Sequence, residues 1–209
     1  MSDTIHNKLR EKILNGSYST GAILKEKDLA EEFGVSRTPV RESLARLEWE
    51  RLVTIIPRAG ALVAPIEIAL VKEAYKVRYV LDGQLGREAA KRVTAQQIAD
   101  MKELREECAG LVASGSQSEL NSVTRRFRGV LGEACGNRIL AELTEQLFNV
   151  SVRVWQGLHD PDSHSELANA LLSEMDSTIA AMSARDPDDA EKIMQDAIDY
   201  YTARLREMF

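Results

Sequence analysis

The segment Asp28–Gly60 constrains the fold most, because it predicts two short helices joined by a tight turn. The first helix is expected over 28–33 and ends at Gly34, since glycine adopts the left-handed backbone that a tight turn requires. Ser36 is a suitable N-cap for the second helix, and Pro39 fits its first turn.

The second helix combines an apolar stripe with a basic one. Its apolar residues recur at i, i+4 and i+7, which predicts one buried face made by Val40, Leu44 and Leu47. Arg37 and Arg41 lie four residues apart on a neighbouring stripe. A capped helix that displays two guanidinium groups after a glycine turn is typical of a helix-turn-helix that faces the DNA major groove.

A β-hairpin is predicted directly after this helix. Residues 52–56 alternate as a strand, Pro57–Gly60 form a turn, and residues 61–63 return. Arg58 gives the hairpin a basic tip, as in the wing of a winged helix. The alternative is a hairpin that only closes the small core, with Arg58 solvated.

The remaining pattern is helical. A first helix is expected over 4–14, followed by a loop over 17–24. Pro65 marks the boundary between a winged helix-turn-helix domain, residues 1–65, and an all-helical domain, residues 66–209. The helices expected in the second domain cover residues 66–93, 94–113, 119–134, 138–157, 164–184 and 187–208. The apolar face of the first of them is assigned to Val71, Val77, Val80, Leu81 and Leu85. The fold class is therefore mainly α.

Charge is distributed unevenly along the chain. The net charge is −6, yet residues 1–65 carry 10 Lys/Arg against 9 Asp/Glu, and residues 66–209 carry 17 against 24. A DNA surface in the first part therefore requires its basic residues to cluster on one face. Cys108 and Cys135 fit no metal-ligand spacing and favour a reducing compartment. With no signal peptide and no long apolar run, we expect a cytoplasmic protein that does not contact the membrane.

The segment LAEEFGVSRTPVRESLARLEWERLVTIIPRAGALV resembles the winged-helix domain of GntR-type bacterial transcription regulators. Three later segments, VRYVLDGQLGREAA, RRFRGVLGEACGNRIL and RDPDDAEKIMQDAI, resemble the helical effector-binding and dimerisation domain, called FCD, of the FadR/VanR branch. The resemblance implies a transcription regulator that binds double-stranded DNA and a small-molecule effector as a homodimer.

Within this resemblance, the DNA contacts can be assigned residue by residue. Arg37 and Arg41 are expected to read guanine bases. Arg46 contacts a phosphate or pairs with Glu50. The other expected contacts go to the phosphate backbone or the minor groove, and come from Lys27, Ser36, Thr38, Arg58 and Gly60.

The metal site of many relatives is expected to be absent. Those relatives bind a divalent metal through one Asp and three His, and these positions correspond here to Thr124, Arg128, Met175 or Asp176, and Ala197. The chain has 3 histidines, His6, His159 and His164, and from those positions they cannot converge on one ion. No metal or other cofactor is therefore expected.

A small acidic effector is expected in the same place. Arg128 provides a permanent cation where relatives hold the metal, and Arg78 corresponds to an arginine that lines their pocket. Two guanidinium groups can bind a carboxylate or phosphate bidentately. Asp176 could pair with one of them, and further hydrogen bonds are assigned to Thr124, Asn137 and Tyr201. The alternative is that Arg78–Asp82 and Arg128–Asp176 are structural ion pairs in a degenerate pocket.

Three functions can be compared on these grounds. The first is a regulator, in the family's commoner mode a repressor, that binds a pseudo-palindromic operator as a homodimer and releases DNA when the effector binds. The second is a constitutive DNA-binding dimer whose helical domain has lost its effector site. The third is an enzyme, but the sequence contains no nucleophile–base set, phosphate-binding loop or HExxH motif, so we expect none.

Overall fold

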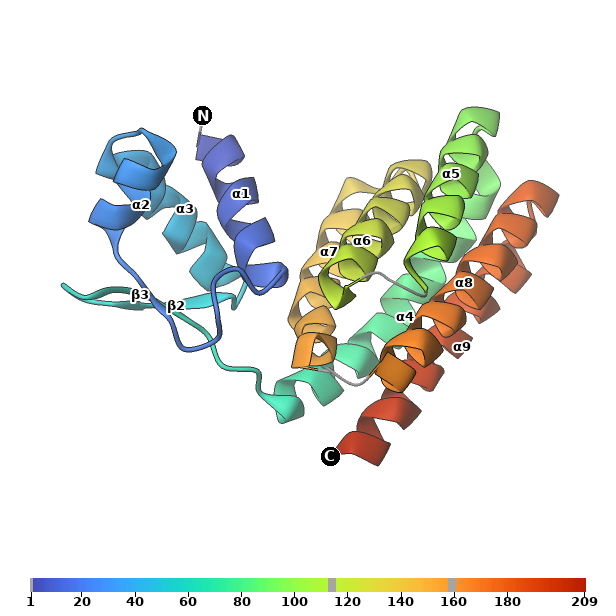
Figure 1. The fold of residues 1–209 in the computed structure, drawn as a ribbon. Coiled ribbons are helices and arrows are strands. Elements are labelled where there is room, and N and C mark those ends of the chain that lie inside the picture. The colour runs from blue at the N-terminus through green and yellow to red at the C-terminus, as the bar shows by residue number, and fades with distance from the viewer. Residues whose placement is uncertain (1, 113–115, 158–160) are drawn as a thin grey trace. The chain divides into compact units, whose positions relative to one another are not determined.

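The computed structural model describes residues 2–112, 116–157 and 161–209. These residues form two compact units, Met1–Glu67 and Ile68–Phe209 (Figure 1). The sequence also predicts a turn over 114–116 and a polar loop over 159–162, and both lie largely outside the described residues.

The first unit has three helices and a small antiparallel sheet in its described residues. Its elements are α1 (Ser2–Leu14), β1 (Ile23–Leu24), α2 (Glu26–Phe33), α3 (Arg37–Trp49), β2 (Val53–Ile56) and β3 (Gly60–Val63). The sheet order is β1-β3-β2. The loop predicted over 17–24 is wrong at its end, because Ile23 and Leu24 pair with Leu62 and Ala61. Two residues are too few to show the alternation that reveals a strand.

The helix-turn-helix follows the predicted pattern. Gly34 ends α2 with φ 65° and ψ 37°, and its backbone N–H closes the helix on the carbonyls of Ala30 and Glu31. The predicted apolar stripe of α3 is buried at no more than 2% exposure; its members are Val40, Leu44 and Leu47. Helix α3 packs on α1, whose Leu9 and Ile13 are also buried. Each such burial contributes about 1.5–3 kcal/mol.

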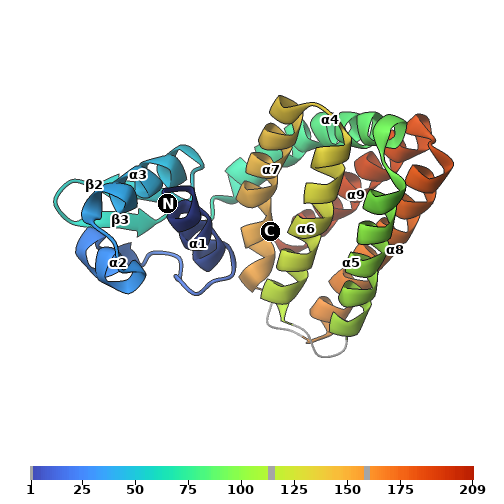
Figure 2. The same cartoon turned by 90° about the horizontal axis from the view of Figure 1, so that it is seen from above.

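The second unit is a helical bundle. Its elements are α4 (Ile68–Arg92), α5 (Ala95–Leu111), α6 (Gln117–Ala134), α7 (Arg138–Val152), a 3-10 turn η1 (Arg153–Gly157), α8 (Pro161–Ala184) and α9 (Pro187–Met208). Helix α4 packs on α9, α7 and α6, and α5 lies between α6 and α8 (Figure 2). Thr94 and Gln97 form a capping box at the start of α5, as the sequence T-A-Q-Q over residues 94–97 predicts. The predicted fold class, a winged helix-turn-helix followed by an all-helical domain, is confirmed.

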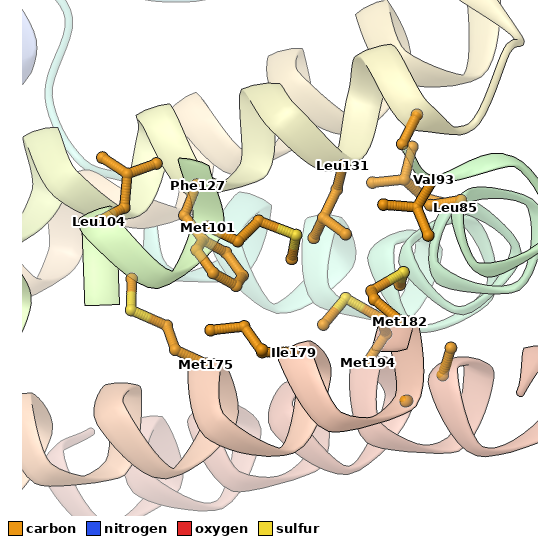
Figure 3. Packing of buried hydrophobic residues seen from close by; sticks show 14 of the residues in the cluster. Leu85, Val93, Met101, Leu104, Phe127, Leu131, Met175, Ile179, Met182 and Met194 are labelled. Atoms are coloured by element: carbon orange, nitrogen blue, oxygen red, sulfur yellow. The ribbon is translucent and has the colours of Figure 1, made fainter. Parts of the chain in front are cut away.

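The core of the bundle is aliphatic and rich in methionine. Met101 of α5, Met175 and Met182 of α8, and Met194 of α9 are at most 2% exposed and belong to the same buried cluster as Leu131 of α6 (Figure 3). Unbranched thioether side chains fill irregular space between helices that cross at different angles. Gly86 of α4 permits the close approach of α9, since a Cβ there would lie 2.8 Å from the carbonyl oxygen of Ala190.

The buried face of α4 differs from the predicted one. Val77 and Val80 are 47% and 62% exposed, whereas Arg78 and Asp82 are buried. The buried residues nearest to them, Val71, Tyr75 and Leu85, share one stripe with this charged pair. Arg78 and Asp82, which the alternative given in the sequence analysis pairs, lie inside because their charges neutralise each other.

Candidate DNA-binding surface and effector cavity

Helix α3 presents a basic stripe beside its buried one. Arg37, Thr38 and Arg41 are exposed in its first two turns, and the apolar stripe lies underneath. Ser43, within the same helix, is turned inward and donates a hydrogen bond of 2.7 Å to the carbonyl of Pro39. The predicted division of α3 into a buried and a basic face is therefore present in the fold.

The flanking candidates lie on the exposed side of α2 and α3. Ser36 is at the N-cap position of α3, with φ −74° and ψ 167°, but its side chain makes no capping hydrogen bond. The Lys27 ammonium is 3.7 Å from the Glu31 carboxylate on the surface of α2. Arg46 is exposed in the last turn of α3, and the Glu50 carboxylate beyond it is hydrogen-bonded to Nε2 of buried His6 at 2.7 Å.

Arg41 is held by a carboxylate of the preceding helix. Its Nε and Nη2 atoms donate to the two carboxylate oxygens of Glu26 at 3.0 and 2.7 Å. The hydrogen bond from Arg41 lowers the pKa of Glu26, so the pair is ionised at neutral pH. This bidentate contact uses the Nε/Nη2 edge of the guanidinium, one of the two edges that can pair with a guanine base.

The hairpin tip contains two left-handed residues. Arg58 has φ 68° and an exposed side chain, and Gly60 has φ 125°. A Cβ on Gly60 would lie 2.3 Å from the carbonyl oxygen of Leu24, where β1 meets β3. Gly60 is thus required by the close packing of the sheet, whatever it contacts on DNA.

A small cavity of about 50 Å³ lies inside the helical unit between α4, α6, α7, η1, α8 and α9. Its polar and charged lining comprises Arg78, Gln117, Asn121, Thr124, Arg128, Ser151 and Glu174. Its apolar and aromatic lining comprises Tyr75, Leu120, Phe148, Val152, Trp155, Leu167, Leu171 and Tyr201. Such a mixture is typical of a small-molecule site.

The Asp82 carboxylate accepts hydrogen bonds from the guanidinium groups of both Arg78 and Arg128 at one end of this cavity. Arg78 donates to Asp82 Oδ2 from Nε at 3.0 Å and Nη2 at 2.8 Å, and Arg128 Nη2 donates to Asp82 Oδ1 at 2.9 Å. Burial opposes ionisation of Asp82, but Arg128 and Arg78 hold its pKa below the usual value. Arg78 Nη1 also donates to Ser151 Oγ at 2.8 Å. The three groups therefore carry a net charge of about +1.

Aromatic rings stack against these cations. The Arg78 guanidinium lies 5.6 Å from the Tyr75 ring and 5.4 Å from the Phe148 ring, and Arg128 lies 5.1 Å from Phe148. Trp155 Nε1 donates to the Tyr75 hydroxyl at 3.0 Å. These contacts fix the positions of both guanidinium groups.

A second carboxyl group lies across the cavity. Tyr201 donates a hydrogen bond of 3.2 Å to Glu174 Oε2. Burial raises the pKa of Glu174, although Arg128 and Arg78 oppose the shift. Glu174 and Tyr201 also line an outer groove between α8 and α9, so this pair separates the cavity from that groove.

Four of the six predicted effector residues line the cavity: Arg78, Thr124, Arg128 and Tyr201. The other two, Asp176 and Asn137, do not line it, and their assignment to this site must be corrected. Asp176 is half exposed and accepts hydrogen bonds of 2.8 and 2.9 Å from Arg105, because α8 turns it toward α5. Asn137 caps α7, where its side chain accepts from the backbone of Leu140 at 3.2 Å. The pair Arg128–Asp176 is therefore wrong, and Arg128 pairs with Asp82 instead.

Sequence reasoning missed the polar stripe that α6 presents to the cavity. Gln117 and Asn121 precede Thr124 and Arg128 at helical spacing, i, i+4, i+7 and i+11, and all four line the cavity. That spacing was available in the sequence. Glu174 and Ser151 had no such signal, since they enter the cavity from other helices.

The residues of this site do not fit a divalent cation. The cavity lining includes the Arg128 guanidinium, whose positive charge would repel a metal ion. Within residues 2–112, 116–157 and 161–209, no three His, Cys, Asp or Glu side chains are grouped as metal ligands would be. In the same part of the chain, no helix is long and apolar enough to span a bilayer.

A winged helix joined to a helical domain with an internal polar cavity defines a ligand-responsive class of DNA-binding proteins. Residues 1–63 match the family of bacterial regulatory proteins called the gntR family, and residues 73–200 match the FCD domain. The chain belongs to the GntR family of transcription regulators, with an FCD domain. It is not an enzyme, as its families and relatives are regulators.

Individual relatives agree with this assignment. The HTH-type transcriptional regulator McbR of Escherichia coli is 32% identical over 74% of this chain and 69% of its own length. The HTH-type transcriptional repressor RspR of Escherichia coli is 24% identical over 100% of this chain and 90% of its own. The solved structure of E. coli McbR/YncC superposes with a TM-score of 0.86 at 26% identity, covering 99% of this chain and 97% of that one.

Proposed function

We propose that this GntR-family regulator is a repressor that binds a pseudo-palindromic operator as a homodimer and releases it when a small acid enters the helical cavity. The observation that carries the DNA part is the face of α3, where Arg37, Thr38 and Arg41 are exposed above a fully buried stripe. The word repressor in the name of RspR supports the sign of regulation.

Homodimer formation is supported by apolar side chains left exposed on two helices that pack together. Val77 and Val80 on α4 are 47% and 62% exposed, and Ile139 and Leu143 on α7 are 67% and 42% exposed. Apolar residues gathered on adjacent helices favour burial against another protein surface. A second copy would also supply the second recognition helix that specific operator affinity needs.

An acidic effector is supported by the charge inside the cavity. Asp82 neutralises one of the two guanidinium groups, so Arg78, Arg128 and Asp82 together retain about one positive charge. The Nε atom of Arg128 is buried and has no hydrogen-bond partner. A single carboxylate would balance this charge and accept that hydrogen bond.

The same contacts favour one competing function, a constitutive DNA-binding dimer. The Asp82 carboxylate already pairs with the guanidinium groups of Arg78 and Arg128, as in a structural ion-pair network. The cavity decides between the two functions: a site that binds acids raises the melting temperature at saturating ligand, and a purely structural one does not respond.

The primary test is selection of binding sites from random duplex DNA, with the wild type and with the double variant Arg37→Ala, Arg41→Ala. We expect the wild type to enrich a palindrome and the variant to lose it. A matched control is Lys8→Ala, Lys76→Ala, which removes two exposed positive charges outside α3. If no sequence is enriched even at low salt, the assignment of α3 as the recognition helix fails.

A further inference from the structure

Two amide side chains at the start of α6 are incompletely satisfied inside the cavity. Gln117 Nε2 donates to Asn121 Oδ1 at 3.0 Å. The other polar atoms of the pair, Gln117 Oε1 and Asn121 Nδ2, are buried and have no hydrogen-bond partner. Asn121 itself is only 5% exposed. Buried polar atoms without partners are uncommon in native proteins and require an explanation.

The pair offers one donor and one acceptor whichever way the amides are oriented. With the assigned orientation, Asn121 supplies the free N–H and Gln117 the free oxygen. If both amides are turned over, the roles of the two residues are exchanged, but one donor and one acceptor still remain. A single ligand group that both accepts and donates a hydrogen bond would therefore satisfy the two free atoms of this pair.

The unpartnered Nε of Arg128 lies further along the same stripe of α6. Arg128 is seven residues after Asn121, so their Cα atoms are separated by roughly 10 Å along the helix. The cavity lining also includes the apolar and aromatic side chains of Leu120, Phe148, Trp155 and Leu171. The cavity thus combines two cations, an amide pair and apolar side chains.

We infer that the effector is a bifunctional molecule, with one carboxylate at Arg128, an apolar body, and a distal hydroxyl or amide group that Asn121 and Gln117 recognise. This inference rests on the proposed effector function of the cavity and specifies its ligand. A short acid without the distal group leaves the amide pair unsatisfied. A neutral apolar molecule leaves the charge of Arg128 uncompensated.

The test uses matched pairs of probes and the full-length protein. The probes are linear monocarboxylates of graded length, each with and without an ω-hydroxyl group, and phenylalkanoates with and without a para-hydroxyl group. Affinity is measured by calorimetry and by the rise in melting temperature. In the wild type, we expect the hydroxylated member of the best-fitting pair to bind about tenfold more tightly than its partner.

Two variants test whether this preference for the hydroxylated probe comes from the amide pair. Asn121→Leu and Gln117→Leu keep the side-chain volume and remove the hydrogen bonds, so each is expected to bind both members of a pair equally. Ser122→Ala, on the exposed side of the same helix, should retain the wild-type preference. The comparison in the wild type requires no variant and remains decisive if a variant does not fold.

The outcomes separate this inference from the proposed function. If the acids bind and release DNA, but the hydroxyl group gives no gain in the wild type, the distal recognition is wrong and the acidic effector stands. The same conclusion follows if Asn121→Leu and Gln117→Leu both keep the preference. If neither series binds the wild type at any length, the acidic effector and this inference are both overturned.

Discussion

Arg41 at the start of the recognition helix is bound by Glu26 at the start of α2, through hydrogen bonds of 3.0 and 2.7 Å. The contact orients the guanidinium in the absence of DNA, and Nε and Nη2 can reach a base edge only when it opens. If Arg41 reads a base through these two donors, as we propose, operator binding exchanges one bidentate partner for another.

This exchange predicts the effect of Glu26→Gln. The variant removes a carboxylate that competes for Arg41 and repels phosphates, so operator affinity should rise a few-fold. Fluorescence anisotropy with the selected duplex measures the change. Glu11→Gln on the exposed side of α1 makes the same change in charge and should have a smaller effect. Weaker operator binding by Glu26→Gln would show that Glu26 prepares Arg41 for DNA instead of competing with it.

The wing residue Arg58 combines a left-handed backbone with an exposed charge. Arg58→Gly should leave the fold intact and raise the free energy of unfolding by up to about 1 kcal/mol, since glycine adopts φ 68° without strain. It should weaken binding to all duplexes similarly and reduce the slope of log affinity against log salt by about 1. An unchanged salt slope would exclude a phosphate contact by the wing.

The ion-pair network predicts the result of Asp82→Asn. The change leaves two buried guanidinium groups without their counter-charge, so the free energy of unfolding should fall by about 3–5 kcal/mol. Chemical denaturation measures this loss, and exposed Asp199→Asn is the control. A bound carboxylate should stabilise the Asp82→Asn variant more than the wild type. The opposite order would mean that acids do not approach these cations.

The pKa of Glu174 predicts a specific dependence of stability on pH. Because burial raises this pKa, the folded state binds more protons than the unfolded state, and stability falls as pH rises from the ordinary glutamate pKa, about 4.3, through the folded value. Glu174→Gln should therefore be more stable than the wild type at pH 7, and the difference should shrink toward pH 4. Tyr201 can still donate to the amide oxygen.

Thermal unfolding across this pH range measures the Glu174 effect, with exposed Glu103→Gln as the control. Glu174→Gln should also bind monocarboxylates more tightly at pH 7, because a negative charge leaves the cavity. A stability difference that is constant with pH would show that Glu174 does not titrate in this range.

The exposed apolar residues of α4 and α7 predict how the dimer can be disrupted. Val80→Glu places a charge on a side chain that is 62% exposed, so it should leave the protomer folded and weaken self-association at least about tenfold. Sedimentation velocity gives the dissociation constant, and circular dichroism checks the fold. Lys102→Glu on the exposed side of α5 is the control. A dimer that tolerates Val80→Glu would use another surface.

The local sequence pattern predicted the buried face of α3 correctly, but not that of α4. In α3 the stripe of Val40, Leu44 and Leu47 and the neighbouring basic stripe both follow from a period of 3.6 residues. In α4 the same rule placed Val77 and Val80 on the buried face, whereas the structure exposes both. Periodicity treats each residue by its polarity alone, whereas Arg78 and Asp82 are buried together because each neutralises the other.

The sequence by itself determined the elements with local causes: the glycine turn, the faces of α3, the basic hairpin tip and the caps at Thr94 and Asp186. Each depends on contacts within a few residues. Only the tertiary structure decided that Asp82, and not Asp176, neutralises Arg128, and that Glu174 enters the cavity. Those contacts join helices far apart in the chain, and which side chains meet depends on how the whole bundle packs.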